Sequence, residues 1–321
     1  MPPALQTTSR SQYAPLFLED NRLPETPAGR KRTGGRAEKK SLARRMRLPH
    51  ELRMPELKAF ASSVAIVVSS CDAFFDAWRP FVFFFRKHWS DCPFPVYLIV
   101  NRLRVRSNIV QPIAVGPDRD WASNMAVALA TISQPYILYF QEDYFLNGDV
   151  KSEQLAGDFA YAFENDAASF CFYARSVLEP NFQPLNDRFG VVPRDSDGRT
   201  RLQATLWKKD VLQATLRPGE SAWNMEARAS ERTSDLLTLS YSQRHDVPIP
   251  YLMSAIVRGL WTPEAISLCQ QAGVEIQPRF RSIHSDVPWR RRFRRALDRI
   301  KLPLALARQG QRPINLDSPS A

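Results

Sequence analysis

The chain has 321 residues, 44% of them hydrophobic and nineteen of them Phe, so it is long enough to bury one large core or two modest ones. Its net charge of +11 suggests a nucleic-acid partner, but residues 1–58 hold 13 Lys/Arg against 6 Asp/Glu, and residues 279–321 hold 11 against 3. The central segment, 59–278, holds 20 against 24 and is mildly acidic, which argues against nucleic-acid binding by the core.

The cysteine pattern and the distribution of apolar residues bear on location. The four cysteines show no CxxC spacing and no disulfide-framework density, which favours a reducing cytoplasm. No apolar run follows Met1, so a secretory signal is not expected. No run approaches the roughly 18 apolar residues of a spanning helix, so any membrane contact is expected to be peripheral.

The first segment, residues 1–58, is rich in Pro, Arg, Lys, Thr and Gly and is predicted to be a disordered basic leader. Two interpretations stay open. The leader is either an electrostatic tether to an anionic surface, or a solvated tail or upstream extension from a misassigned start, given Met46 and Met54.

Strands and helices are expected to alternate over residues 59–150. The predicted strands cover 59–68, 95–101 and 136–140, and the predicted helices cover 78–89 and 118–132. This order is typical of a parallel α/β sheet with right-handed crossovers, in which ligands bind beyond the carboxyl ends of the strands.

Residues 151–278 form a less regular half with a mixed α/β pattern. Apolar residues at 155, 159 and 163 predict a helix, and further helices are expected over 208–216, 221–231 and 262–273. Strands are expected near 168–173, 191–192, 202–207, 236–242 and 250–257.

Two adjacent acids, Glu142 and Asp143, follow the apolar strand in the sequence YFQEDYFL. Burying unpaired negative charge is costly, so acids in such a place usually meet a cation. Mg²⁺ and Mn²⁺ prefer oxygen ligands and are commonly held by one or two carboxylates together with substrate phosphates. The sequence therefore predicts a Mg²⁺ or Mn²⁺ site in which the metal neutralises charge on a diphosphate leaving group.

Five blocks in this order resemble bacterial sugar-nucleotide-dependent glycosyltransferases of the GT-A fold, of the surface-polysaccharide type. They are VAIVVSSCD, DRDWASNMAVALATISQPYILYFQEDYFL, LQATLWKKDVL, ESAWNMEA and SAIVRGLW, within residues 60–275. The resemblance implies a single catalytic domain over 59–278, with a donor half (59–150) and an acceptor half (151–278). In that family the acids after the central strand form a DxD motif that coordinates the metal, so Glu142-Asp143 departs from a strict DxD and Asp143 is the more secure ligand. The donor side would further be lined by Ser70, Asp72, Asp120, Trp121 and Asn124.

The acceptor half is expected to supply a general base if the transfer inverts the anomeric centre, because a carboxylate usually removes the acceptor hydroxyl's proton. In GESAWNME, Trp223 and Glu226 lie three apart on one helical face, and Glu226 is the predicted catalytic base. Trp223 is assigned to acceptor binding or to core packing. Gln203 and Trp207 lie four apart on a predicted strand and so share a face, either as a pocket wall or, for Trp207, in the core.

The C-terminal segment, 279–321, contains WRRRFRRALDRIKLPLAL, a basic amphipathic helix with Trp289, Phe293, Ala296, Leu297 and Ile300 on one face. It is either an interfacial binder of an anionic membrane surface or a helix docked on the protein with a solvated basic face.

The expected function is a cytoplasmic, metal-assisted glycosyltransferase that acts on a nucleotide-sugar donor and a glycan or lipid-linked acceptor, peripherally at the inner face of the membrane. A nucleotidyl- or phosphotransferase that uses the same metal site is an alternative. A nucleic-acid-binding protein that uses the basic termini is a further one.

Overall fold

A computed structural model describes residues 56–174, 182–196, 198–242, 247–277 and 280–318. The predicted leader lies almost wholly outside these residues, and its structure is not described. The first described element is the 3₁₀ helix η1 (Leu57–Phe60), in which Leu57 and Phe60 are both buried.

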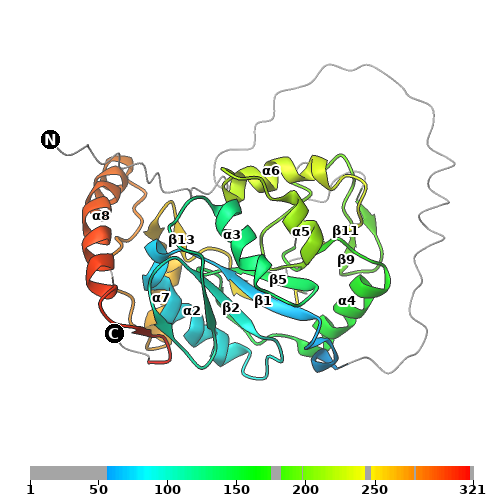
Figure 1. Cartoon of the computed structure of the whole chain (residues 1–321), viewed down its shortest axis with the longest axis horizontal. Coiled ribbons are helices and arrows are strands. Elements are labelled where there is room, and N and C mark those ends of the chain that lie inside the picture. The colour runs from blue at the N-terminus through cyan, green and yellow to red at the C-terminus, as the bar shows by residue number, and fades with distance from the viewer. Residues whose placement is uncertain (1–55, 175–181, 197, 243–246, 278–279, 319–321) are drawn as a thin grey trace, which may run out of the picture.

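One large sheet dominates the described part of the chain (Figure 1), with the strand order β4-β2-β1-β5-β10-β7-β11-β9-β8. Its strands are β1 (Val64–Ser69), β2 (Val96–Val100), β4 (Gln111–Ala114), β5 (Tyr136–Gln141), β7 (Ser169–Cys171), β8 (Gln183–Pro184), β9 (Phe189–Val191), β10 (Thr205–Lys208) and β11 (Thr238–Tyr241). The four strands from β4 to β5 are parallel. β10 runs antiparallel to both β5 and β7, while β7 and β11 are parallel to each other. A parallel first half thus continues into a mixed second half, and the predicted α/β class, with a mostly parallel half followed by a mixed one, is confirmed.

Helices cover both faces of this sheet (Figure 1). Their bounds are η2 (Asp72–Phe74), α2 (Phe75–His88), α3 (Trp121–Ala130), α4 (Ser152–Glu164), α5 (Lys209–Thr215), α6 (Ala222–Arg232), α7 (Pro263–Gln271) and α8 (Pro288–Gln309). One buried cluster joins the sheet to α2 and α4, and a second joins its other face to α3, α5 and α6.

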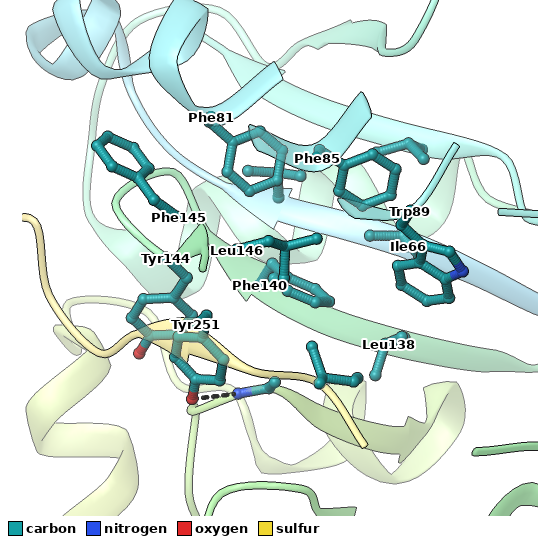
Figure 2. Packing of buried hydrophobic residues seen from close by; sticks show 14 of the residues in the cluster. Ile66, Phe81, Phe85, Trp89, Leu138, Phe140, Tyr144, Phe145, Leu146 and Tyr251 are labelled. Atoms are coloured by element: carbon teal, nitrogen blue, oxygen red, sulfur yellow. Dashed lines mark hydrogen bonds between the residues drawn. The ribbon is translucent and has the colours of Figure 1, made fainter. Parts of the chain in front are cut away.

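The central strand β5 is buried on both faces, as its continuous apolar sequence predicts. Leu138 and Phe140 belong to the cluster on the α2 side, and Ile137 and Tyr139 to the cluster on the α3 side. Figure 2 shows Phe140 below Phe81 of α2, and their ring centroids lie 6.4 Å apart. The same view shows Tyr251, whose hydroxyl accepts a hydrogen bond from the backbone N–H of Ala204.

Among the described residues, three short strand pairs lie outside the large sheet, and two of them join segments that are distant in the sequence. Their strands are β3 (Val105–Arg106), β6 (Phe145–Leu146), β12 (Tyr251–Leu252), β13 (Ile256–Val257), β14 (Leu260–Trp261) and β15 (Ile314–Asn315). β12 pairs with β6, β13 with β14, and β15 with β3. The segment that follows β5 is therefore packed against residues more than a hundred positions later.

The strand predicted over 59–68 is shorter than expected, because it begins only at Val64. Residues 57–60 form η1 instead, and the ring centroid of Phe60 lies 5.8 Å from that of Phe159 and 5.2 Å from that of Phe163. Both partners belong to α4, so tertiary packing on this helix overrides the local β-propensity of the segment.

Candidate functional site

The acidic pair lies at the carboxyl ends of the parallel strands. Ser69 of β1 pairs with Gln141 of β5, so Ser70 and Glu142 follow at the same edge of the sheet. The backbone N–H of Glu142 donates to the carbonyl of Ser69 over 3.3 Å. This is the edge at which α/β sheets bind their ligands.

Both carboxylates are buried, and each has one unpaired oxygen. Glu142 is 3% exposed and Asp143 is 5% exposed. Asp143 Oδ2 accepts a hydrogen bond of 3.2 Å from the backbone N–H of Ile256. Glu142 Oε2 and Asp143 Oδ1 are buried with no hydrogen-bond partner among the described residues. Two orphaned acceptors on consecutive residues fit a site for a hard cation.

Burial opposes the charge on both acids. It raises the pKa of Glu142 well above its usual range, and the neighbouring Asp143 charge raises it further. Burial also raises the pKa of Asp143 to about 7, although the backbone N–H of Ile256 opposes the rise. A bound cation would favour the ionised forms.

The positive charge near this pair comes from Arg281, which sequence reasoning missed. Arg281 is buried, and its Nε lies 3.0 Å from Oδ2 of Asp76 on α2. Its guanidinium also donates to the carbonyls of Gly259 and Ala73. The charge of Arg281 lowers the pKa of both Glu142 and Asp143, but its hydrogen bonds go to Asp76 and to backbone carbonyls. The two orphaned oxygens therefore keep their capacity to bind a ligand.

Asp72, predicted to line the donor side, organises the backbone between β2 and β3. Its carboxylate accepts hydrogen bonds from three consecutive backbone N–H groups, those of Asn101, Arg102 and Leu103, at 2.8–3.0 Å. The Asn101 side chain in return accepts from the Asp72 N–H over 2.9 Å. These contacts use both carboxylate oxygens, so the geometry favours a structural role.

Replacing Asp72 by Ala should therefore lower the free energy of unfolding by about 1–3 kcal/mol, because three backbone donors lose their acceptor. Urea denaturation measures this loss, and Asp91→Ala, an exposed acid, is the control. An Asp72→Ala protein with unchanged stability would contradict the structural role.

Two more predicted donor residues have structural contacts. Ser70 Oγ accepts a 2.7 Å hydrogen bond from Trp78 Nε1. Trp121 is buried in the cluster under α3, and its Nε1 donates to Ser69 Oγ over 2.9 Å. Both side chains lie near the strand ends, but Trp121 faces the core.

The start of α3 holds the remaining donor candidates. Asp120 is the N-cap, and it accepts from the Ser123 N–H over 2.8 Å and from Ser123 Oγ over 2.7 Å. Asn124 is buried and donates to Asp118 over 2.7 Å. Asp120 thus fixes the position of α3.

Glu226, the predicted base, is joined to the acidic segment through one residue, Leu202. The Leu202 N–H donates to Glu226 Oε1 over 2.6 Å, and the Leu202 carbonyl accepts from the hydroxyl of Tyr144 over 3.4 Å. Tyr144 directly follows Asp143 in the chain. Burial raises the pKa of Glu226 to about 7, against the opposing effects of the Leu202 N–H and the Arg201 charge. A carboxylate with such a pKa suits proton transfer near neutral pH.

The three predicted acceptor residues have different environments. Gln203, next to Leu202, has a buried Oε1 without a partner, and Trp223, one turn before Glu226, has a buried Nε1 without a partner, in both cases among the described residues. Trp207 is fully buried under α3, α5 and α6, so an acceptor-binding role does not fit its position. Of its two interpretations, core packing is the one that fits.

A pocket of about 480 Å³ lies elsewhere on the surface, along α7, and is lined by Asn147, Leu252, Pro263, Glu264, Ser267, Leu268 and Gln271. None of the predicted site residues lines it. Within the described ranges, no group of three or more His, Cys, Asp or Glu side chains is arranged to hold a metal. The site in question has two carboxylates, which leaves the remaining coordination positions to substrate oxygens and water.

Comparison with known proteins finds distant structural similarity only. No family model and no curated protein matches the sequence. Residues 1–349 of S. aureus TarS superpose with a TM-score of 0.38 and 12% identity over 59% of each chain. A longer TarS structure gives a TM-score of 0.39, 10% identity and coverage of 59% of this chain and 36% of that one. The bifunctional IspDF from Campylobacter jejuni gives a TM-score of 0.35 and 11% identity, and the match covers 60% of this chain and 52% of that one. This chain thus spans less than two thirds of each of these structures, and similarity at this level assigns no function.

Proposed function

We propose that this protein is a glycosyltransferase that moves a sugar from a nucleotide-diphosphate donor to a hydroxyl group of a glycan or lipid-linked glycan. The observation that carries the proposal is the contact through Leu202. It joins Glu226, with a pKa near 7, to the segment that holds two buried acids with orphaned oxygens. Together these groups would provide a cation site and a base, as metal-assisted transfer to a hydroxyl requires.

Asp143 and Glu142 would hold the metal through the oxygens that lack a partner, Asp143 Oδ1 and Glu142 Oε2. A bound Mg²⁺ or Mn²⁺ supplies neutralisation of the charge on the donor diphosphate. Ile256 fixes the orientation of Asp143 through its backbone N–H, and Arg281 offsets part of the negative charge when the metal is absent.

Glu226 would accept the proton of the acceptor hydroxyl as its oxygen attacks the sugar. Its carboxylate is held by the Leu202 N–H at 2.6 Å, which leaves its other oxygen, Oε2, for the hydroxyl. Gln203, which follows Leu202, and Trp223, one turn before Glu226, would add an acceptor (Oε1) and a donor (Nε1) that have no partner among the described residues, and both suit hydroxyl groups of a sugar. Trp223 would also offer its ring to the C–H face of the acceptor.

Thermal-shift measurements on the full chain test this proposal, because a ligand that binds only the folded state raises its stability. We expect at least one nucleotide-diphosphate sugar to raise the melting temperature in Mn²⁺ and to have little effect in a chelator. The shift in melting temperature should grow with ligand concentration. At a ligand concentration of a hundred times Kd, the free energy of unfolding should rise by about 2.7 kcal/mol.

Two controls separate the alternatives. A metal-dependent shift with nucleoside triphosphates, and none with nucleotide sugars, would favour a nucleotidyl- or phosphotransferase. A shift with duplex DNA that falls steeply with salt, and none with any nucleotide, would favour nucleic-acid binding through the basic ends.

A further inference from the structure

The helix α8 combines a face that packs on the protein with a face exposed to solvent. Towards the protein, Ala305 is buried, and the buried Asp298 accepts hydrogen bonds from the Ser282 N–H and Ser282 Oγ at 2.9 and 2.8 Å. Arg294 donates to the carbonyl of Ile283 over 2.6 Å. The orientation of α8 about its own axis is thereby fixed.

Four large apolar side chains form a stripe on the exposed face. Trp289, Phe293, Ile300 and Leu304 are 65%, 59%, 66% and 60% exposed. Their spacings of four, seven and four residues place them within one narrow sector of the helix. The stripe is about 22 Å long at 1.5 Å per residue. We call these four residues the apolar stripe of α8.

Exposed arginines flank the apolar stripe on both sides. At 100° per residue, Arg292 and Arg299 lie along one border, and Arg290 and Arg308 along the other. The helix carries eight basic residues, Arg290, Arg291, Arg292, Arg294, Arg295, Arg299, Lys301 and Arg308. Its one acid, Asp298, is already bonded to Ser282. The exposed face therefore combines apolar and positively charged groups without a negative charge.

The positive charge of α8 is not neutralised by the neighbouring hairpin. Arg258 lies in the turn between β13 and β14, and its charge acts on Arg295 together with those of Arg291 and Arg299. Desolvation first, and then these three charges, lower the pKa of Arg295. An anionic partner would relieve this repulsion. A second copy of the helix would increase it, so charge argues against pairing of two stripes.

We propose that the exposed face of α8 binds an anionic lipid surface, with the helix axis parallel to the membrane plane. The apolar stripe would enter the boundary between headgroups and acyl chains, and the flanking arginines would contact lipid phosphates. No described helix is long and apolar enough to cross a membrane, and α8 would bind in the interface. This inference is independent of the proposed reaction. In Figure 1, α8 lies at the edge of the molecule, with its outer side away from the sheet.

Co-sedimentation of the full chain with vesicles tests the proposal. Phosphatidylcholine vesicles are compared with vesicles in which phosphatidylglycerol replaces part of the phosphatidylcholine, at low and at near-physiological salt. We expect binding to the anionic vesicles only, and weaker binding in salt, because the Debye length falls to about 8 Å at 0.15 M.

Two variants separate the charged and apolar contributions. Changing Arg290, Arg292, Arg299 and Arg308 to Gln should lower the partition coefficient by about 10- to 100-fold at low salt, since each basic residue near an anionic surface contributes up to about fivefold. Changing Trp289, Phe293, Ile300 and Leu304 to Ala should also reduce binding to the anionic vesicles. The binding that remains should depend more strongly on salt. All eight side chains are exposed, so the melting temperature should change little.

A charge-matched control removes four exposed basic residues outside α8, with Lys58, Arg86, Lys87 and Lys151 changed to Gln. This control should bind the anionic vesicles as the unmodified protein does. If net charge alone mattered, the control and the arginine variant of α8 would lose binding equally. Equal binding by all three variants and the unmodified chain would overturn the proposal. So would a dimer that only the Ala variant abolishes, in a protein that binds no vesicles, because a second copy would then cover the stripe.

Discussion

Replacing Glu226 by Gln should lower kcat by about 10²–10⁴-fold, the usual contribution of a general base, once the donor and acceptor are known. Gln has the same shape and keeps an oxygen that accepts the hydrogen bond from Leu202, but it cannot take a proton. Substrate binding should change much less than turnover. The comparison is made by steady-state kinetics on both proteins.

The pH dependence distinguishes a base from a residue that only positions the substrate. Because the pKa of Glu226 is raised to about 7, the ionised and active form accumulates only above this pH. The value of kcat/KM in the unmodified protein should therefore rise with pH through about 7 and level off above it. With the metal site saturated, which keeps Asp143 ionised, the Gln variant should lack this rise.

Stability provides a second measurement that needs no substrate. A carboxyl whose pKa is raised by folding stabilises the fold while it is protonated, and this contribution is lost as the pH rises from its ordinary value of 4.5 through about 7. The Gln variant should escape this loss and melt at least as high as the unmodified protein above pH 7.

Glu231→Gln is the matched control, because Glu231 is exposed on the same helix, α6. It should leave turnover and the pH profile unchanged. A Glu226→Gln enzyme with normal kcat would assign the proton transfer to another group.

Much of the fold could be predicted because the strands of the donor half are short apolar runs. In β1 and β5 nearly every position is buried, so the hydrophobic sequence alone marks these strands. The segment before β1 was predicted wrongly because Phe60 packs on α4, about a hundred residues later. Among the described strands, β3 and β15 pair only with each other, and neither has a local pattern that would reveal it.

The site could be predicted in part for the same physical reasons. Glu142 and Asp143 follow a buried strand, so their position is marked by the sequence. The ion pair of Arg281 with Asp76 joins residues 205 positions apart, and no local pattern indicates it. Trp207 shows a different limit. Alternation tells which side chains share a face of β10, but not that α3, α5 and α6 cover that face completely.

Replacing Asp143 by Asn should abolish metal-dependent binding of the nucleotide-diphosphate donor while leaving the fold intact. The carboxylate would hold the cation and the cation would hold the diphosphate, so one substitution removes both contacts. We expect donor affinity in Mn²⁺ to fall by at least about a hundredfold, since even groups that only support a metal ligand are worth about 10- to 100-fold.

The environment of Asp143 explains why the fold should survive this change. An Asn oxygen at the position of Oδ2 can still accept the hydrogen bond from Ile256, and the variant no longer buries a charge beside Glu142. The melting temperature without metal should therefore stay the same or rise.

Isothermal titration calorimetry in Mn²⁺ and in a chelator measures donor binding by both proteins, with the exposed Asp91→Asn as the control. If Asp143→Asn bound the donor in Mn²⁺ as tightly as the unmodified chain, the orphaned oxygens would have to serve another ligand. If the two proteins differed equally with and without metal, Asp143 would contact the donor directly instead of through a cation.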